Sequence, residues 1–144
     1  MHKISEIYTK AVILSAGQGR RLLPLTKNSP KCLLPVSGKP IIEWQIDALL
    51  TAGIKEIIVV TGFQTSLVEK LLQKRYPDHK KIRILFNPFF EVPDNLPTCW
   101  VARSVMDGNF LLLNGDTIFD VSLLKQVLES EPAPITLSID YKKD

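Results

Sequence analysis

The sequence predicts an α/β fold, in which a doubly wound, mostly parallel sheet is flanked by helices. Short apolar runs recur along the 144 residues, and each is continuous instead of alternating, as is typical of strands buried on both faces. Amphipathic helical patterns lie between these runs, and such alternation favours right-handed βαβ units. Because 144 residues fit one domain, we expect a Rossmann-like architecture in a single domain.

The predicted strands are rich in β-branched residues or leucine. They cover residues 11–14, 57–60, 82–86, 110–113 and 135–139. Only residues 140–144 follow the last strand, which leaves nothing to cover the next edge of the sheet. We therefore expect the chain to be C-terminally truncated.

Helical patterns separate the predicted strands. The first helix begins at Pro40 and ends at Gly53, and the second ends at Tyr76-Pro77. The third covers about residues 96–106, and the fourth follows Asp120, which is a good N-cap residue. The faces expected to be buried carry Ile42, Ile46, Leu49 and Leu50, then Leu67, Val68, Leu71 and Leu72, and finally Leu123, Leu124, Val127 and Leu128.

The composition excludes several classes of protein. Apolar residues make up 45% of the chain and charged residues 23%, as in ordinary globular proteins. No apolar run approaches the roughly 18 residues that cross a bilayer, and the N-terminus lacks the apolar region of a secretory signal. Two cysteines, Cys32 and Cys99, imply no disulfide framework. We expect a cytoplasmic protein that does not associate with membranes.

Positive charge is concentrated near the N-terminus, although the whole chain carries only +3. Residues 7–42 contain no Asp or Glu, and their basic residues are Lys10, Arg20, Arg21, Lys27, Lys31 and Lys39. A nucleic-acid binder usually spreads its cations along a face and interleaves aromatic residues, so no nucleic-acid partner is expected. The compact stretch predicts a site for an anion with several phosphate charges, while a solvated basic loop explains it equally well.

A glycine-rich turn directly follows the first predicted strand. Ligands of open α/β sheets bind beyond the carboxyl ends of strands, and Gly17 and Gly19 would let the backbone approach a phosphate closely. The dinucleotide-binding fingerprint requires a third small residue at position 22, where Leu22 stands. The P-loop motif fails as well, because Gly38-Lys39 is followed by proline.

Residues 17–36 read GQGRRLLPLTKNSPKCLLPV. This stretch resembles the sugar-phosphate nucleotidyltransferases, whose signature is G-x-G-x-R-L-x-P-L-T-x-x-x-P-K-x-L-L-P-V. The resemblance continues through GKPIIEWQIDALLTAGIKEIIVVTG and FLLLNGDTIF, and so covers most of the chain. It implies that residues 1–144 are the N-terminal, nucleotide-binding part of a nucleotidyltransferase domain, in an enzyme that joins a nucleoside triphosphate to a small phosphomonoester and releases pyrophosphate.

The resemblance also implies roles for individual residues. Arg21 would grip the triphosphate and stabilise the leaving pyrophosphate, and Lys31 would hold the α-phosphoryl group and the acceptor phosphate in line. Such chemistry needs positioning and charge neutralisation more than covalent catalysis. A solvated surface charge is the competing interpretation for each. The backbone expected to lie against the nucleotide belongs to Leu14, Ala16, Gly17, Gln18 and Gly19.

Asp116 is the predicted metal ligand. It follows a predicted strand through Asn114-Gly115, and a hard carboxylate oxygen at that place suits Mg²⁺. Family members carry a G-D pair there with the aspartate on the metal, although N-G-D is also a common turn composition. The family's second metal carboxylate lies beyond residue 144, so a non-catalytic nucleotide-binding or regulatory module is the alternative function.

Residues 87–100, NPFFEVPDNLPTCW, resemble the phosphocholine cytidylyltransferase branch. Oxygen atoms of Asp94 and Asn95 could accept a hydrogen bond from the amino group of cytosine, while helix capping explains these residues equally well. Phe89, Phe90 and Trp100 could cage a quaternary ammonium group, although core packing is the commoner role of such residues. We expect CTP as the nucleotide and phosphocholine or a sugar 1-phosphate as the acceptor, and a homo-oligomer is compatible with the sequence.

Overall fold

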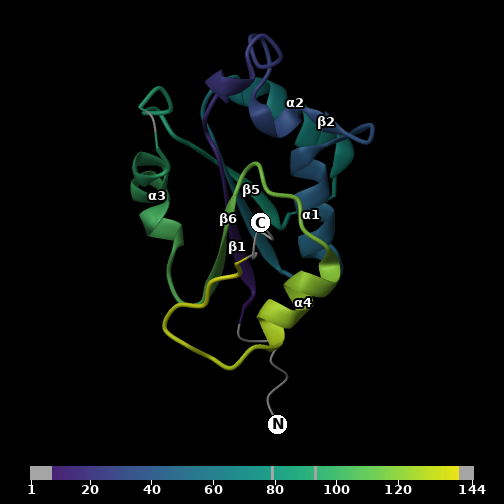
Figure 1. Cartoon of the computed structure of the whole chain (residues 1–144), viewed down its shortest axis with the longest axis vertical. Coiled ribbons are helices and arrows are strands. Elements are labelled where there is room, and N and C mark those ends of the chain that lie inside the picture. The colour runs from purple at the N-terminus through teal and green to yellow at the C-terminus, as the bar shows by residue number, and fades with distance from the viewer. Residues whose placement is uncertain (1–7, 79, 93, 140–144) are drawn as a thin grey trace, which may run out of the picture.

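The computed structural model describes residues 8–78, 80–92 and 94–139 (Figure 1). Within them, one sheet has the strand order β5-β4-β1-β6, and all its neighbouring strands are parallel. Its strands are β1 (Lys10–Ser15), β4 (Glu56–Thr61), β5 (Ile82–Phe86) and β6 (Phe110–Asn114). The strand order reverses at β1, because β4 and β5 lie on one side of it and β6 lies on the other. Open α/β sheets bind their ligands at such a switch point.

Helices cover both faces of the sheet, which confirms the predicted doubly wound arrangement. The α-helices are α1 (Ile41–Thr51), α2 (Thr65–Arg75), α3 (Leu96–Ala102) and α4 (Val121–Glu129). Helices α1, α2 and α4 lie on one face and α3 on the other (Figure 1). The shorter elements are the 3₁₀ turns η2 (Arg20–Leu22), η3 (Lys31–Leu33) and η4 (Arg103–Val105), and an antiparallel hairpin of β2 (Pro35–Val36) and β3 (Lys39–Pro40).

The apolar runs are continuous because the central strands contribute to a core on each face. In β1, Ala11 and Ile13 pack into the cluster that includes α1, α2 and α4. The alternate residues Val12 and Leu14 pack into the second cluster, beside Ala102 of α3. All four β1 side chains are buried.

Helix α1 begins one residue after and ends two residues before the predicted limits, and each end has a local cause. Pro40 occupies the N-cap position, and its fixed φ suits entry into a helix. Gly53 follows the helix with φ +88°, where its amide donates to Leu50 O at 3.1 Å and that of Ile54 donates to Leu49 O at 3.0 Å. This pair of bonds is a Schellman motif, which explains the glycine.

Helix α4 confirms the predicted cap and corrects one predicted core residue. The Asp120 carboxylate accepts a hydrogen bond from the Ser122 amide at 2.7 Å. Leu124 and Leu128 are buried, but Leu123 is 40% exposed. The helix touches the core along a narrow i, i+4 stripe, so the prediction that Leu123 is buried was wrong.

The predicted strand at residues 135–139 is also wrong. Ile135 and Leu137 are each 79% exposed and Ile139 is 69% exposed, and no described residue of this segment belongs to a strand. An apolar segment forms a strand only where a neighbouring strand satisfies its backbone groups. In the described chain β6 pairs with β1 alone. Residues 140–144 lie outside the described residues, and no described helix is long and apolar enough to cross a membrane.

Candidate functional site

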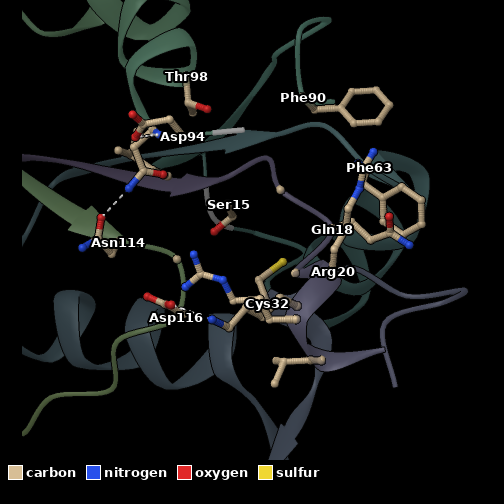
Figure 2. Close-up of a pocket in the computed structure, with 18 of the residues that line it drawn as sticks. Ser15, Gln18, Arg20, Cys32, Phe63, Phe90, Asp94, Thr98, Asn114 and Asp116 are labelled. Atoms are coloured by element: carbon tan, nitrogen blue, oxygen red, sulfur yellow. Dashed lines mark hydrogen bonds and ion pairs between the residues drawn. The ribbon is translucent and has the colours of Figure 1, made fainter. Parts of the chain in front are cut away.

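The carboxyl ends of β1 and β6 border a cavity of about 670 Å³ (Figure 2). The predicted site residues that line it are Leu14, Gly17, Gln18, Gly19, Arg21, Lys31, Asp94, Asn95 and Asp116. Ala16 is buried and does not line the cavity, and its backbone oxygen accepts a hydrogen bond from the Phe63 amide at 2.9 Å. Residues that are far apart in the sequence therefore meet at the switch point of the sheet.

The glycine-rich turn is held in place by its own hydrogen bonds. The carbonyl of Gly19 accepts from the hydroxyl of the buried Thr26 at 2.9 Å, and the side-chain amide of Gln18 donates to Thr26 O at 3.1 Å. Gly19 has φ +76°, and a Cβ there would lie 2.9 Å from the Cβ of Lys31. Glycine at position 19 is therefore required by the turn itself.

Gly17 lies in open space. A Cβ at this position would meet no atom within 4 Å, and Gly17 is not among the glycines with positive φ. The folded chain therefore does not need a glycine here. What glycine does provide at position 17 is bare backbone facing the cavity, which a ligand can approach closely.

The cavity contains both paired and unpaired cations. Lys31 Nζ lies 2.6 Å from Asp116 Oδ2. Among the described residues, the side chains of Arg20 and Arg21 form no ion pair, although both line the cavity. Lys39 has a different role, because it pairs with Asp47 at 2.5 Å on the hairpin side of α1. The basic stretch thus supplies three cations to the cavity.

Asp116 is ionised at neutral pH. The hydrogen bond from Lys31 lowers the pKa of its carboxyl group below the ordinary value of 3.8, and this outweighs the opposing effect of partial burial. Its backbone is placed by Gly115, whose amide donates to Leu14 O at 2.9 Å. A Cβ on Gly115 would lie 2.4 Å from that same oxygen, so only glycine allows the end of β6 to approach β1 so closely.

Asp94 and Asn95 face the cavity from the loop before α3. Asn95 Nδ2 donates to Asn114 Oδ1 at 3.0 Å, and the Asp94 carboxylate accepts from the Asn95 amide at 2.6 Å. Asn95 occupies the N-cap position of α3, but its side chain makes no capping hydrogen bond. The capping explanation therefore does not account for either side chain.

The loop that carries these two residues is fastened by a buried asparagine. Asn87 is fully buried, and its Nδ2 donates to the hydroxyl of Thr98 at 3.1 Å. Its Oδ1 accepts from the Phe89 amide at 2.8 Å. Asn87 therefore joins the exit of β5 to the first turn of α3, which carries the cavity-lining Thr98.

The three aromatic residues considered for a cationic cage do not share a cavity. Phe90 lines the main cavity with Phe63, and the two ring centroids are 6.4 Å apart. Phe89 and Trp100 line a separate apolar surface pocket, where the Arg103 guanidinium lies 4.2 Å from the Trp100 ring centroid. The structure does not support the cage hypothesis.

The cavity offers no reactive thiol. Cys32 lines it but is 2% exposed, and burial raises the pKa of its thiol to about 12. Burial also raises the pKa of the half-buried Cys99 thiol, which lies outside this cavity. Since the thiolate is the nucleophilic form of cysteine, neither residue is suited to covalent catalysis at neutral pH.

Several lining residues were not identified from the sequence. Asn114 directly precedes Gly115-Asp116, and its place at the end of a predicted strand could have marked it. Phe63 and Thr98 carry no local signal, because they reach the cavity only through the packing of distant loops. Figure 2 shows Phe63 and Phe90 on the side opposite Asp94 and Asn114.

The fold and the cavity define a doubly wound α/β protein with a cationic crevice at the switch point of its sheet. Comparison of the sequence with known families gives the particular family. The chain belongs to the nucleotidyl transferase family, whose sequence model matches residues 10–141.

Individual relatives share the same segment. The chain is 46% identical over 96 residues to the CTP:phosphoglutamine cytidylyltransferase of Campylobacter jejuni, covering 67% of this chain and 36% of that enzyme. It is 35% identical over 127 residues to the mannose-1-phosphate guanyltransferase of Hypocrea jecorina, covering 86% of this chain and 34% of that enzyme.

A solved structure of a phosphocholine cytidylyltransferase has a similar fold and agrees with the predicted resemblance to that branch of the family. The CTP:phosphocholine cytidylyltransferase from Streptococcus pneumoniae superposes with a TM-score of 0.67 at 32% identity, covering 81% of this chain and 50% of that one. The chain therefore spans half or less of the length of these relatives.

Proposed function

We propose that the protein is a nucleotidyltransferase that joins a nucleoside triphosphate, with CTP preferred, to a small phosphomonoester and releases pyrophosphate. One observation carries the proposal: a cavity at the switch point brings together a glycine-rich turn, the cations Arg20, Arg21 and Lys31, and the carboxylate of Asp116. Two polyanionic reactants repel each other until cations neutralise them, and this cavity supplies those cations.

In the proposed reaction, an oxygen of the acceptor phosphate attacks the α-phosphorus of the nucleotide. The bond from that phosphorus to the β-phosphate oxygen breaks, and pyrophosphate leaves from the opposite side with inversion. Arg21 binds the triphosphate and stabilises the leaving group, while Lys31 holds the reacting phosphates in line. Transfer in this reaction is direct and forms no covalent enzyme intermediate.

Asp116 fits a magnesium ion that arrives with the nucleotide. The described residues contain no group of three or more His, Cys, Asp or Glu that could hold a metal by themselves. Magnesium is commonly bound through one or two carboxylates together with substrate phosphates and water, so a single ionised aspartate in the cavity is sufficient. When bound, the ion would neutralise charge on the triphosphate.

The proposed preference for cytosine depends on the orientation of Asn95. Because its Nδ2 donates to Asn114, the side-chain oxygen of Asn95 is available as an acceptor for the amino group of cytosine. The similarity to two cytidylyltransferases supports CTP as the nucleotide. A guanyltransferase is also among the relatives, so the choice of base needs its own test. Phosphocholine is the first acceptor to test, followed by sugar 1-phosphates.

Alanine substitutions at the two charged residues test this function. Lys31→Ala and Asp116→Ala should each lower pyrophosphate release from CTP and phosphocholine by about 100-fold or more, because each removes a charge that acts on the reacting phosphates. Both side chains are partly exposed, at 34% and 46%, so the circular dichroism spectrum should be retained. Lys70→Ala, an exposed lysine of α2, is the matched control and should keep full activity.

The outcomes separate the two candidate functions. Unchanged turnover in either variant would contradict the role assigned to that residue. Binding of CTP by the wild-type protein without pyrophosphate release, whichever phosphomonoester is supplied, would instead support a non-catalytic nucleotide-binding module.

A further inference from the structure

Gln45 is a buried polar residue in the middle of α1. It is 1% exposed, and its neighbours on the same helix face include the apolar core residues Ile42 and Leu49. Its side-chain amide has two N–H groups, and both are used. Nε2 donates to Asn114 O at 2.7 Å and to Thr117 O at 2.8 Å.

The two acceptors are the backbone carbonyls on either side of Gly115-Asp116. Gly115 is itself fastened to β1 through Leu14 O, and it has no room for a Cβ. The turn that presents Asp116 is therefore held from two directions, by β1 through Gly115 and by α1 through Gln45. Asp116 projects from this turn toward Lys31.

Core stability alone does not explain a glutamine at this position. Among the described residues, the buried Oε1 atom of Gln45 has no hydrogen-bond partner. A buried acceptor without a partner destabilises a fold, and an apolar side chain of similar length would remove that acceptor but would take from the Asn114 and Thr117 carbonyls the donors that they have here. Compared with an apolar side chain, the amide of Gln45 adds the two hydrogen bonds to the 114–117 turn.

We propose that Gln45 is a positioning residue that holds the 114–117 turn so that Asp116 can act on a magnesium-bound nucleotide. This inference rests on the proposed function, because it assigns Gln45 an effect that passes through Asp116. Groups that orient a metal-binding carboxylate commonly change metal affinity when they are replaced, although they do not touch the metal.

Gln45→Met tests the proposal, because methionine matches the length of glutamine but donates no hydrogen bond. Binding of CTP is measured by isothermal titration calorimetry in MgCl₂ and again in EDTA. We expect the variant to lose about tenfold in affinity in magnesium and to match the wild type in EDTA. Gln73→Met, the same change at an exposed position of α2, is the matched control and should bind as the wild type does.

A double-mutant cycle separates positioning from general structural support. If Gln45 acts through Asp116, adding Gln45→Met to Asp116→Asn should weaken binding no further. Additive losses, an equal loss in magnesium and in EDTA, or wild-type affinity in magnesium would each overturn the proposal. Gln45→Asn, which withdraws the amide by one methylene, is the second variant if Gln45→Met does not fold, and the same loss is expected.

Amide hydrogen exchange tests the placement without nucleotide. In Gln45→Met, exchange in residues 114–117 should accelerate about tenfold while exchange in β4 stays unchanged, because the lost bonds restrain only that turn. Unchanged exchange in the turn would overturn the positioning role. Faster exchange together with a wild-type protein that binds no nucleotide would instead show that the proposed function fails while the turn is still held by Gln45.

Discussion

Gly17 and Gly115 border the same cavity, but they are glycines for opposite reasons. A Cβ at position 115 would lie 2.4 Å from both Leu14 O and Ser15 Oγ, whereas a Cβ at position 17 would meet nothing within 4 Å. The first glycine is required by the packing of β6 against β1. Packing does not require the second glycine, whose bare backbone borders the cavity, and this distinction can be tested by substitution.

Gly115→Ala should therefore destabilise the fold, and Gly17→Ala should weaken nucleotide binding. For Gly115→Ala we expect a loss of about 1–3 kcal/mol in the free energy of unfolding, typical of overpacking. Gly17→Ala should keep wild-type stability and lose CTP affinity, because its methyl group would project into the cavity in which we propose that the nucleotide binds. Urea denaturation and calorimetric titration of both variants measure this, and the opposite pattern would contradict the assigned roles.

Local sequence patterns could predict single residues of the site but not the contacts between them. Lys31 and Asp116 were each identified in their own motif, yet their ion pair joins positions 85 residues apart and depends on the sheet order. Gln45 and Asn87 were missed because each is a polar residue whose role appears only through the distant backbone or side-chain groups it binds.

At the scale of elements, Asp47 of α1 connects this helix to the β2–β3 hairpin before it and to the end of α2 after it. Its carboxylate pairs with Lys39 of the β2–β3 hairpin at 2.5 Å and accepts a hydrogen bond from the Tyr76 hydroxyl, just after α2, at 2.6 Å. Burial tends to raise the pKa of this carboxyl group, but the hydrogen bonds from Lys39 and Tyr76 outweigh it and lower the pKa below 3.8. The ionised form of Asp47 therefore stabilises the fold.

This shift predicts a pH dependence of stability. Because the folded pKa lies below the unfolded value of 3.8, the stabilisation is present above that pH and is lost as the pH falls through the folded pKa. Urea unfolding should show the wild type more stable than Asp47→Asn at neutral pH, with the difference shrinking as the medium becomes strongly acidic. Asp78→Asn, in an exposed turn, is the control, and a difference that grows on acidification would contradict the assignment.

The elements that form the sheet and cover it were predictable because burial on both faces leaves a continuous apolar signal. The β2–β3 hairpin was not predicted, since strands of two residues carry no periodicity. Residues 135–139 carry the same kind of apolar signal, but a pattern cannot report whether a partner strand is present. Sequence patterns thus identify the segments that can form a strand, but a segment becomes a strand only where a partner strand is available.

For the whole molecule, the local excess of positive charge becomes a three-dimensional feature. Arg20, Arg21 and Lys31 of the basic stretch at residues 7–42 lie next to the carboxyl end of β1, and the crossover to β6 brings the carboxylate of Asp116 to the same crevice. The fold could be predicted from alternating strands and helices, but the position of β6 beside β1 could not. That position creates the cavity, and our central claim is that a nucleotide binds there.

Thermal denaturation with CTP, UTP, GTP, ATP and dTTP, each with and without Mg²⁺, tests that claim most directly. A nucleotide at 100 times its Kd adds about 2.7 kcal/mol of stability, which raises the Tm of a domain of this size by several degrees. We predict that CTP with Mg²⁺ gives the largest rise and that Asp116→Asn removes the contribution of magnesium. A larger rise with another nucleotide would contradict the role of Asp94 and Asn95, and no rise with any nucleotide would contradict the central claim.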